Sequence, residues 1–114
     1  MKMIEIDEFY PEKVRLVKDT MYTGTLSIKI PLIGIVLSGW IVSYYKGKFR
    51  FMPPRKMYYN EKNEKLHYKY YHFPDRAMYQ SFFEELKLVA REYLNERYVI
   101  DGKSMVRKED GVRF

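Results

Sequence analysis

The 114-residue chain has no cysteine, two histidines and six glycines, and each shortage removes a class of chemistry. Without cysteine it has no disulfide, no thiolate nucleophile and no cysteine-based metal site. His67 and His72 stand five residues apart without a carboxylate cluster beside them, so their spacing does not match a metal site. The segments SGW and KGK lack the second glycine of a phosphate-binding loop and the helix that should follow it. We therefore predict no metal and no other cofactor.

Long apolar runs are also missing. The longest, residues 30–42, is interrupted by proline and glycine, and it is shorter than the roughly 20 residues that a membrane-spanning helix needs. The first residues, MKMIEIDEFYPEK, contain no apolar stretch of the kind found in secretory signals. Together with the absence of cysteine, this predicts a cytoplasmic protein that has no membrane partner.

Catalytic signatures are equally scarce. Ser43, His72 and Asp75 resemble a nucleophilic triad only in composition, because almost any chain contains such a set. The carboxylate pairs Glu84-Glu85 and Glu109-Asp110 fall outside the basic segment described next, where a nuclease would need them. We therefore predict that the protein is not an enzyme and has no catalytic residues.

The positive charge, in contrast, is concentrated in one segment. Residues 41–72 carry eight Lys and Arg against Glu61 and Glu64, which equals the entire net charge of +6. The same segment holds seven of the 12 tyrosines. Cations beside aromatic rings suit phosphates and unpaired bases, and no acidic run offsets the excess, so an acidic partner is expected. A solvated basic face without a ligand is the alternative that charge alone leaves open.

Alternation of apolar and polar residues predicts strands over the first two thirds of the chain. The expected strands are two short segments on either side of Pro11, then residues 23–30, 35–45 and 48–52, and two extended pieces around a polar loop at 60–64. Lys46-Gly47 predicts a two-residue hairpin turn, and Pro53-Pro54 predicts the end of a strand. Gly39 indicates a bulge or a close backbone contact.

The spacing of apolar residues changes after Pro74 to i, i+3, i+4 and i+7, which predicts one amphipathic helix over about residues 73–97. We therefore predict a single α+β domain, in which an antiparallel sheet of about four to six strands packs against one long C-terminal helix. Residues 1–12 are expected as an N-terminal extension. Residues 101–114 are expected as a polar tail, which either adds a short edge strand or stays flexible.

Several segments occur in a recognisable order. They are KVRLV, GTLSIKIP, IVLSGWIV, GKFRFMPPRK, LHYKYYHFPDR and AMYQSFFEELKLVAREYL. Over about residues 13–95 this order resembles the stage V sporulation protein G (septation protein) family of small bacterial nucleic-acid-binding regulators. The resemblance implies a sheet-plus-helix fold that dimerises through its sheets and binds DNA or RNA. At matching positions it assigns binding to Arg50, Arg55, Lys56 and Arg76. The loop at 57–65, Trp40 and the tyrosine clusters depart from that family.

We therefore predict a homodimeric nucleic-acid-binding protein, with single-stranded DNA favoured over RNA and duplex DNA. The predicted phosphate contacts are Lys46, Lys48, Arg50, Arg55, Lys56, Lys65, Lys69 and Arg76. The predicted stacking residues are Tyr44, Tyr45, Tyr58, Tyr59 and Tyr70, with Tyr68 and Tyr71 as further candidates. Phe49 and Phe51 are expected in the core. The alternative is a non-enzymatic protein-protein interaction or viral accessory module that uses the same tyrosine-rich face.

Overall fold

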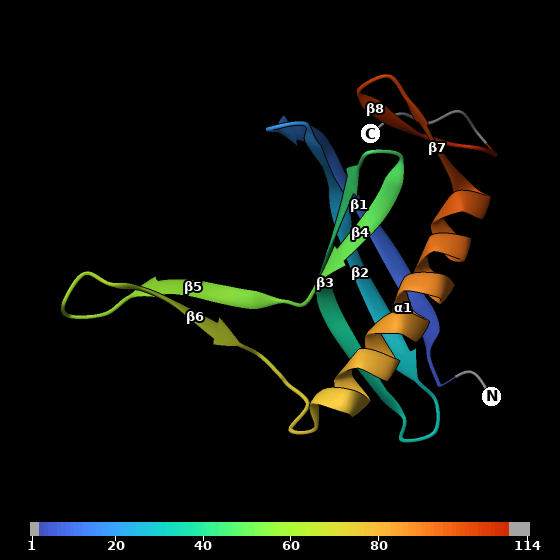
Figure 1. Ribbon diagram of the computed structural model, residues 1–114. Coiled ribbons are helices and arrows are strands. Elements are labelled where there is room, and N and C mark those ends of the chain that lie inside the picture. Colours follow the sequence, from blue (N-terminus) through green and yellow to red (C-terminus); the bar gives the residue numbers. More distant parts are fainter. Residues whose placement is uncertain (1–2, 110–114) are drawn as a thin grey trace.

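The computed structural model describes residues 3–109, apart from the side chains of Tyr68 and Lys69, and within them the chain forms eight strands and one helix. The main antiparallel sheet has the order β1-β2-β3-β4. Its strands are β1 (Glu5–Val17), β2 (Thr20–Ile30), β3 (Ile35–Tyr45) and β4 (Lys48–Met52). Two separate hairpins are β5 (Arg55–Tyr59) with β6 (Lys65–Lys69), and β7 (Tyr98–Asp101) with β8 (Ser104–Arg107). With helix α1 (Arg76–Arg97) packed against the strands, the α+β prediction is confirmed (Figure 1).

One apolar stripe attaches α1 to the sheet. Its residues are spaced four apart and are all buried: Phe82, Leu86, Ala90 and Leu94. They belong to the same core as Leu26, Trp40 and Val42 of the main sheet. Phe49 and Phe51 join this core at 3% and 7% exposure, as predicted. Because burial of each large apolar side chain stabilises the fold by about 1.5–3 kcal/mol, this interface holds helix and sheet together.

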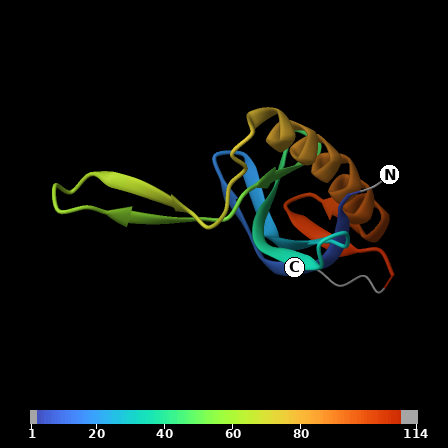
Figure 2. The same ribbon diagram turned by 90° about the horizontal axis from the view of Figure 1, so that it is seen from below.

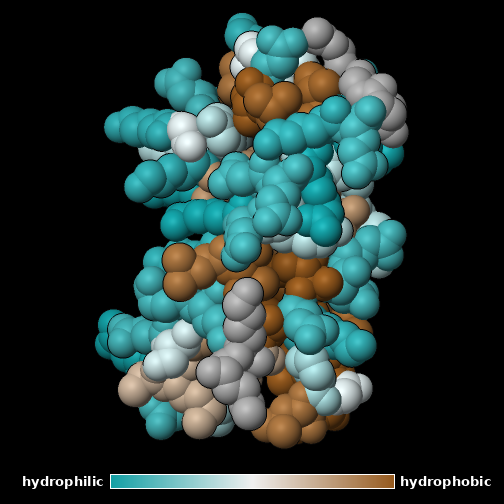
Figure 3. All heavy atoms as spheres, turned by 90° about the vertical axis from the view of Figure 1, so that its right-hand side faces the viewer, coloured by the Kyte–Doolittle hydropathy of each residue, from teal (hydrophilic) through white to brown (hydrophobic). Residues whose placement is uncertain are grey.

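The helix begins where the sequence predicts, within a few residues. The side chain of Asp75 accepts hydrogen bonds from the backbone N–H groups of Ala77 (2.9 Å) and Met78 (3.4 Å), which caps the first turn. The side of the molecule that α1 faces is covered largely by hydrophilic side chains, with hydrophobic ones showing between them (Figure 3). Within residues 3–109, no helix is both long and apolar enough to cross a membrane.

The N-terminal segment belongs to the sheet, which corrects the expectation of an extension over residues 1–12. β1 is one strand rather than two segments divided at Pro11, and Ile4 and Phe9 are buried. Pro11 is tolerated because β1 is an edge strand, where a missing N–H need not break the ladder. The register between β1 and β2 also shifts between Pro11 and Arg15. Periodicity alone could not reveal this, because the irregularity interrupts the alternation.

The segment after α1 forms the β7–β8 hairpin. The ring of Tyr98 meets that of Phe9 edge-on at 5.3 Å between centroids, and Met105 is fully buried. Of the two alternatives for the tail, strand formation therefore holds for residues 104–107. Residues 110–114 of the predicted tail lie outside the described residues.

β5 and β6 project from the rest of the molecule (Figures 1 and 2). We call residues 55–69 the arm. All five residues of β5 are exposed, and the side chain of Asn60 closes the tip by accepting from the N–H groups of Lys62 and Glu64, each at 2.9 Å. The radius of gyration is 15.5 Å, against roughly 13 Å for a compact chain of this length. The two predicted strands around the loop at 60–64 are confirmed.

Candidate nucleic-acid interface

The β3–β4 hairpin presents its cations through a tight turn. Lys46 and Gly47 both have positive φ, 48° and 82°, as a two-residue hairpin turn matched to the strand twist requires. Alternation along β4 then exposes Lys48 and Arg50. The Arg50 guanidinium lies 5.1 Å and the Lys46 ammonium 5.2 Å from the ring centroid of Tyr45. The hairpin thus carries three exposed cations around one aromatic ring.

The two neighbouring tyrosines of this hairpin have different roles. Consecutive strand residues point to opposite faces, so Tyr44 turns toward the core and meets Phe49 edge-on at 5.2 Å between ring centroids. Tyr44 was predicted to stack on bases, but its ring already packs against the core. Tyr45 remains beside the basic side chains.

A row of side chains crosses the main sheet on the face that carries Arg50. The register places Arg50 opposite Ser43, Ser43 opposite Tyr22, and Tyr22 opposite Arg15, so these residues share one face. The Arg15 guanidinium lies 4.8 Å from the centroid of the Tyr22 ring. Burial, together with a hydrogen bond from its hydroxyl to Glu12 (3.1 Å), raises the pKa of Tyr22. Sequence reasoning missed Arg15 and Tyr22 as candidate site residues, although the alternation in KVRLV predicts a strand around Arg15.

A groove at the β4 edge gathers further cations. It encloses about 510 Å³ and is lined by Arg50 together with Lys87 and Arg91 of α1. Arg91 Nε donates to the carbonyl oxygen of Phe49 (3.3 Å), while Lys87 pairs with Glu84 at 2.7 Å. Lys87 and Arg91 lie outside the basic segment of residues 41–72. Only tertiary packing brings these two beside Arg50, so no sequence signal marks them.

Acidic side chains gather at the other edge of the sheet. β1 carries Glu5, Asp7, Glu8 and Glu12 ahead of Lys13 and Arg15, and it lies at the opposite end of the strand order from β4. Carboxylates repel the negatively charged phosphates of a ligand, and the cations of Lys and Arg attract them. An anionic ligand is therefore directed to the β4 side of the molecule.

The arm continues the basic and aromatic character beyond β4. Arg55, Lys56 and Lys65 are exposed. Tyr58 and Tyr59 are 43% and 65% exposed. The register sets Tyr59 opposite Lys65 at the tip, so a ring and a cation stand side by side.

The remaining predicted residues lie at the base of the arm. The backbone of Lys69 pairs with Arg55, while its side chain and that of Tyr68 lie outside the described part. Tyr70 is exposed just beyond β6, and Arg76 is exposed at the first residue of α1. Tyr71 instead packs against Trp40, with 6.0 Å between ring centroids, and belongs to a pocket rather than to the outer face.

Metal-binding groups are not clustered in the described structure. Across residues 3–109, no three side chains of histidine, aspartate or glutamate lie close enough together to hold a metal ion. No protein-family model, no curated protein and no solved structure matches this chain. Its own surface chemistry is therefore what indicates a function.

Proposed function

We propose that the protein binds single-stranded nucleic acid, with single-stranded DNA favoured, along the β3–β4 hairpin and the arm. One observation carries the proposal. Exposed cations lie beside the half-buried Tyr45 on the β3–β4 hairpin and beside the exposed Tyr58 and Tyr59 on the arm that follows it. Phosphates require the cations, and unpaired bases stack on the rings, each stacked base contributing roughly 1–3 kcal/mol.

The exposed surface of the arm supports a bound partner. A two-stranded hairpin is at best marginally stable in water by itself. Met57, Tyr58 and Tyr59 nevertheless remain 52%, 43% and 65% exposed. Apolar surface displayed in this way is typical of interaction sites, and the neighbouring Lys56 and Lys65 suit an anionic one.

The resemblance to the stage V sporulation protein G family supports the same proposal. It assigns binding to Arg50, Arg55, Lys56 and Arg76, and all four are exposed. We extend the proposal to a non-enzymatic, cytoplasmic homodimer. Such a dimer would double the number of basic surfaces available to one strand and raise the overall avidity.

The test is the anisotropy of a fluorescent oligo(dT) titrated with protein at several salt concentrations. For about five phosphate contacts the slope of log affinity against log salt should be about −3.5, because each contact to a single strand contributes about −0.7. Duplex DNA and RNA of equal length are measured in parallel. Undetectable binding, or binding that does not depend on salt, would refute the proposal.

The exposed Met57, Tyr58 and Tyr59 also favour a second candidate, a protein-binding arm, since Tyr and Met are enriched at protein interfaces. Arg55→Ala and Tyr70→Ala separate the two candidates. If both variants lose self-association in light scattering but keep their affinity for oligo(dT), the arm binds protein rather than nucleic acid. If both lose affinity for oligo(dT), the first proposal stands.

A further inference from the structure

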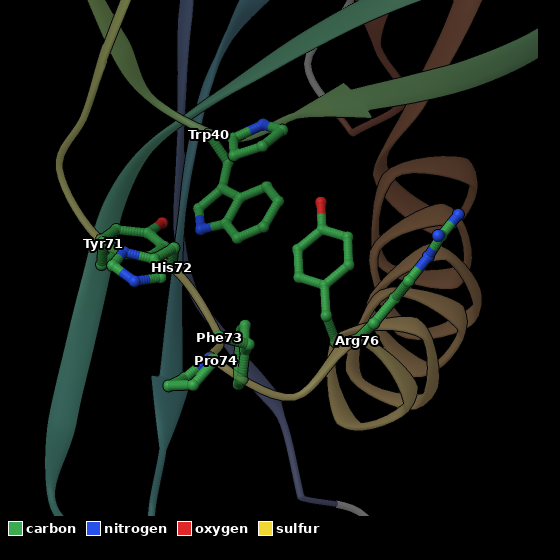
Figure 4. Close-up of a pocket in the computed structure, with 8 residues that line it drawn as sticks. Trp40, Tyr71, His72, Phe73, Pro74 and Arg76 are labelled. Atoms are coloured by element: carbon green, nitrogen blue, oxygen red, sulfur yellow. The ribbon is translucent and has the colours of Figure 1, made fainter.

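A pocket opens where the arm joins the rest of the molecule. It encloses about 270 Å³, near the lower end of the roughly 300–1,000 Å³ of ligand pockets, which suits one small ring system. Its walls come from four parts of the chain: Trp40 of β3, Pro53 before β5, the linker that contains Tyr71, His72 and Phe73, and Arg76 and Tyr79 of α1. Figure 4 shows the labelled side chains around this space.

Two polar atoms in this pocket have no partner among the described residues. They are Nε1 of Trp40 and the hydroxyl oxygen of Tyr71, both buried. Trp40 is fully buried, and a buried donor left unpaired costs about 1–3 kcal/mol. Even if the indole N–H donated to the Tyr71 oxygen, the Tyr71 O–H would still lack an acceptor. Burial raises the pKa of Tyr71 well above its ordinary value, so the hydroxyl stays neutral and remains a donor. Both atoms are closed off from solvent, so an occupant with acceptor atoms would satisfy these groups once the surrounding rings shift to admit it.

The remaining walls restrict the chemistry of the occupant. Aromatic rings of the lining residues provide flat faces: the ring centroids of Trp40 and Tyr71 lie 6.0 Å apart, and those of Phe73 and Tyr79 lie 5.7 Å apart. A cage of rings can also hold a quaternary ammonium ion. Arg76, which is exposed at the rim, disfavours such a cation and favours an anion. The walls therefore suit a flat ring with carbonyl acceptors that carries a negative group.

We propose that this pocket captures one pyrimidine base of the bound strand, with its carbonyl oxygens facing Trp40 and Tyr71 and its phosphate near Arg76. This inference rests on the proposed function, because the arm would deliver the strand to the pocket. Both sides of the arm lead to it, since Pro53 before β5 and Tyr71 after β6 are lining residues. Enclosure between aromatic side chains with hydrogen bonds to the base edge is a general way of holding an unstacked base.

The chain's single tryptophan makes the test direct. Trp40 fluorescence is followed during titration with thymidine 5′-monophosphate, thymidine, choline, (dT)12 and an abasic 12-mer, while calorimetry measures binding of the monophosphate and anisotropy measures both oligonucleotides. We expect saturable quenching by the monophosphate and by (dT)12 but not by the abasic strand.

Tyr71→Phe should weaken monophosphate binding about 3- to 10-fold. Tyr10→Phe, which removes an exposed hydroxyl on β1 outside the proposed interface, is the matched control and should change nothing. Arg76→Gln should abolish the preference for the monophosphate over thymidine.

The outcomes separate the pocket from the proposed function. If (dT)12 binds in a salt-dependent manner while Trp40 emission stays constant and calorimetry detects no monophosphate, the pocket is refuted and the function stands. If choline quenches and the monophosphate does not, the pocket is a cation cage and the inference is wrong. If neither oligonucleotide binds but the monophosphate does, the proposed function fails while the pocket is a nucleotide site.

Discussion

Arg50 is the residue at which the separate basic features meet. It lies on the exposed side of β4, contacts the Tyr45 ring, belongs to the row that reaches Arg15, and lines the groove beside Lys87 and Arg91. Its side chain contributes nothing to the apolar core, which Phe49 and Phe51 enter from the other side of the strand. Arg50 therefore offers a way to test binding with little effect on folding.

Arg50→Gln should weaken oligo(dT) binding and make the slope of log affinity against log salt shallower by about 0.7, because one phosphate contact is lost. Lys29→Gln is the control, since it removes an equal charge from an exposed position on β2, opposite Glu5. Anisotropy titrations of both variants at several salt concentrations provide the comparison. Equal slopes for the two variants would contradict a role for Arg50.

Tyr71 predicts a pH dependence of stability. Burial raises the pKa of its hydroxyl above the ordinary value of 10.0. Its contribution is therefore fully present below pH 10, and it is lost as the pH rises through the folded-state pKa, because the unfolded chain ionises first. Urea unfolding between pH 9 and 11 should show a smaller decline in the free energy of unfolding for Tyr71→Phe than for wild type. Identical declines would show that Tyr71 is not protected by burial.

At the scale of elements, the features set by local chemistry could be predicted from the sequence. The turn at Lys46-Gly47, the end of β4 before Pro53 and the helix start near Asp75 depend on residues within a few positions of each other. The continuity of β1, the row from Arg15 to Arg50 and the groove under Arg91 depend on register and packing between distant segments. No periodicity in one segment encodes those partners.

Gly39 illustrates a feature that was predicted and whose reason is now clear. Leu26 pairs with Trp40 and Ile28 pairs with Leu37, so β3 has an extra residue at this point. Gly39 has φ +85°, and an added Cβ would lie 3.2 Å from Cβ of Pro54. The predicted bulge is confirmed, and the close neighbour, Pro54, directly precedes the arm.

Gly39→Ala should destabilise the protein by about 1–2 kcal/mol through its left-handed conformation, plus a further cost from the contact with Pro54. Gly34→Ala is the matched control, because Gly34 has φ +68° with nothing within 4 Å of the added Cβ. Urea unfolding at one pH should therefore rank Gly39→Ala below Gly34→Ala in stability. Equal losses in the free energy of unfolding would show that Pro54 shifts away from the added Cβ without a loss of stability.

At the scale of the whole molecule, the hydrophobic core and the proposed binding surface lie in different regions of the fold. The core is built from the main sheet, α1 and the β7–β8 hairpin, whereas the arm projects away from it (Figure 2). The main sheet carries exposed cations at its β4 edge, whereas the carboxylates Glu5, Asp7, Glu8 and Glu12 lie on the β1 edge. The net charge alone predicts an acidic partner, and the strand order indicates the side of the molecule on which we propose that it binds.

Replacement of residues 56–68 by a two-glycine link should leave the core intact, because Arg55 and Lys69 are already cross-strand neighbours. We expect the midpoint of thermal unfolding to change by only a few degrees, since a change of 1 kcal/mol corresponds to about 4–8 °C for a domain of this size. Affinity for oligo(dT) should fall at least tenfold. A large loss of stability would show that the arm contributes to folding, and unchanged affinity would remove it from the interface.

The central claim is that a single strand lies on the β3–β4 hairpin and the arm. Amide chemical shifts of the labelled protein, followed by NMR during titration with oligo(dT), test it residue by residue. The largest changes should fall within residues 45–59 and 65–76, while Glu5, Asp7 and Glu8 of β1 stay unchanged. Changes concentrated on β1, or none at saturating oligonucleotide, would contradict the account.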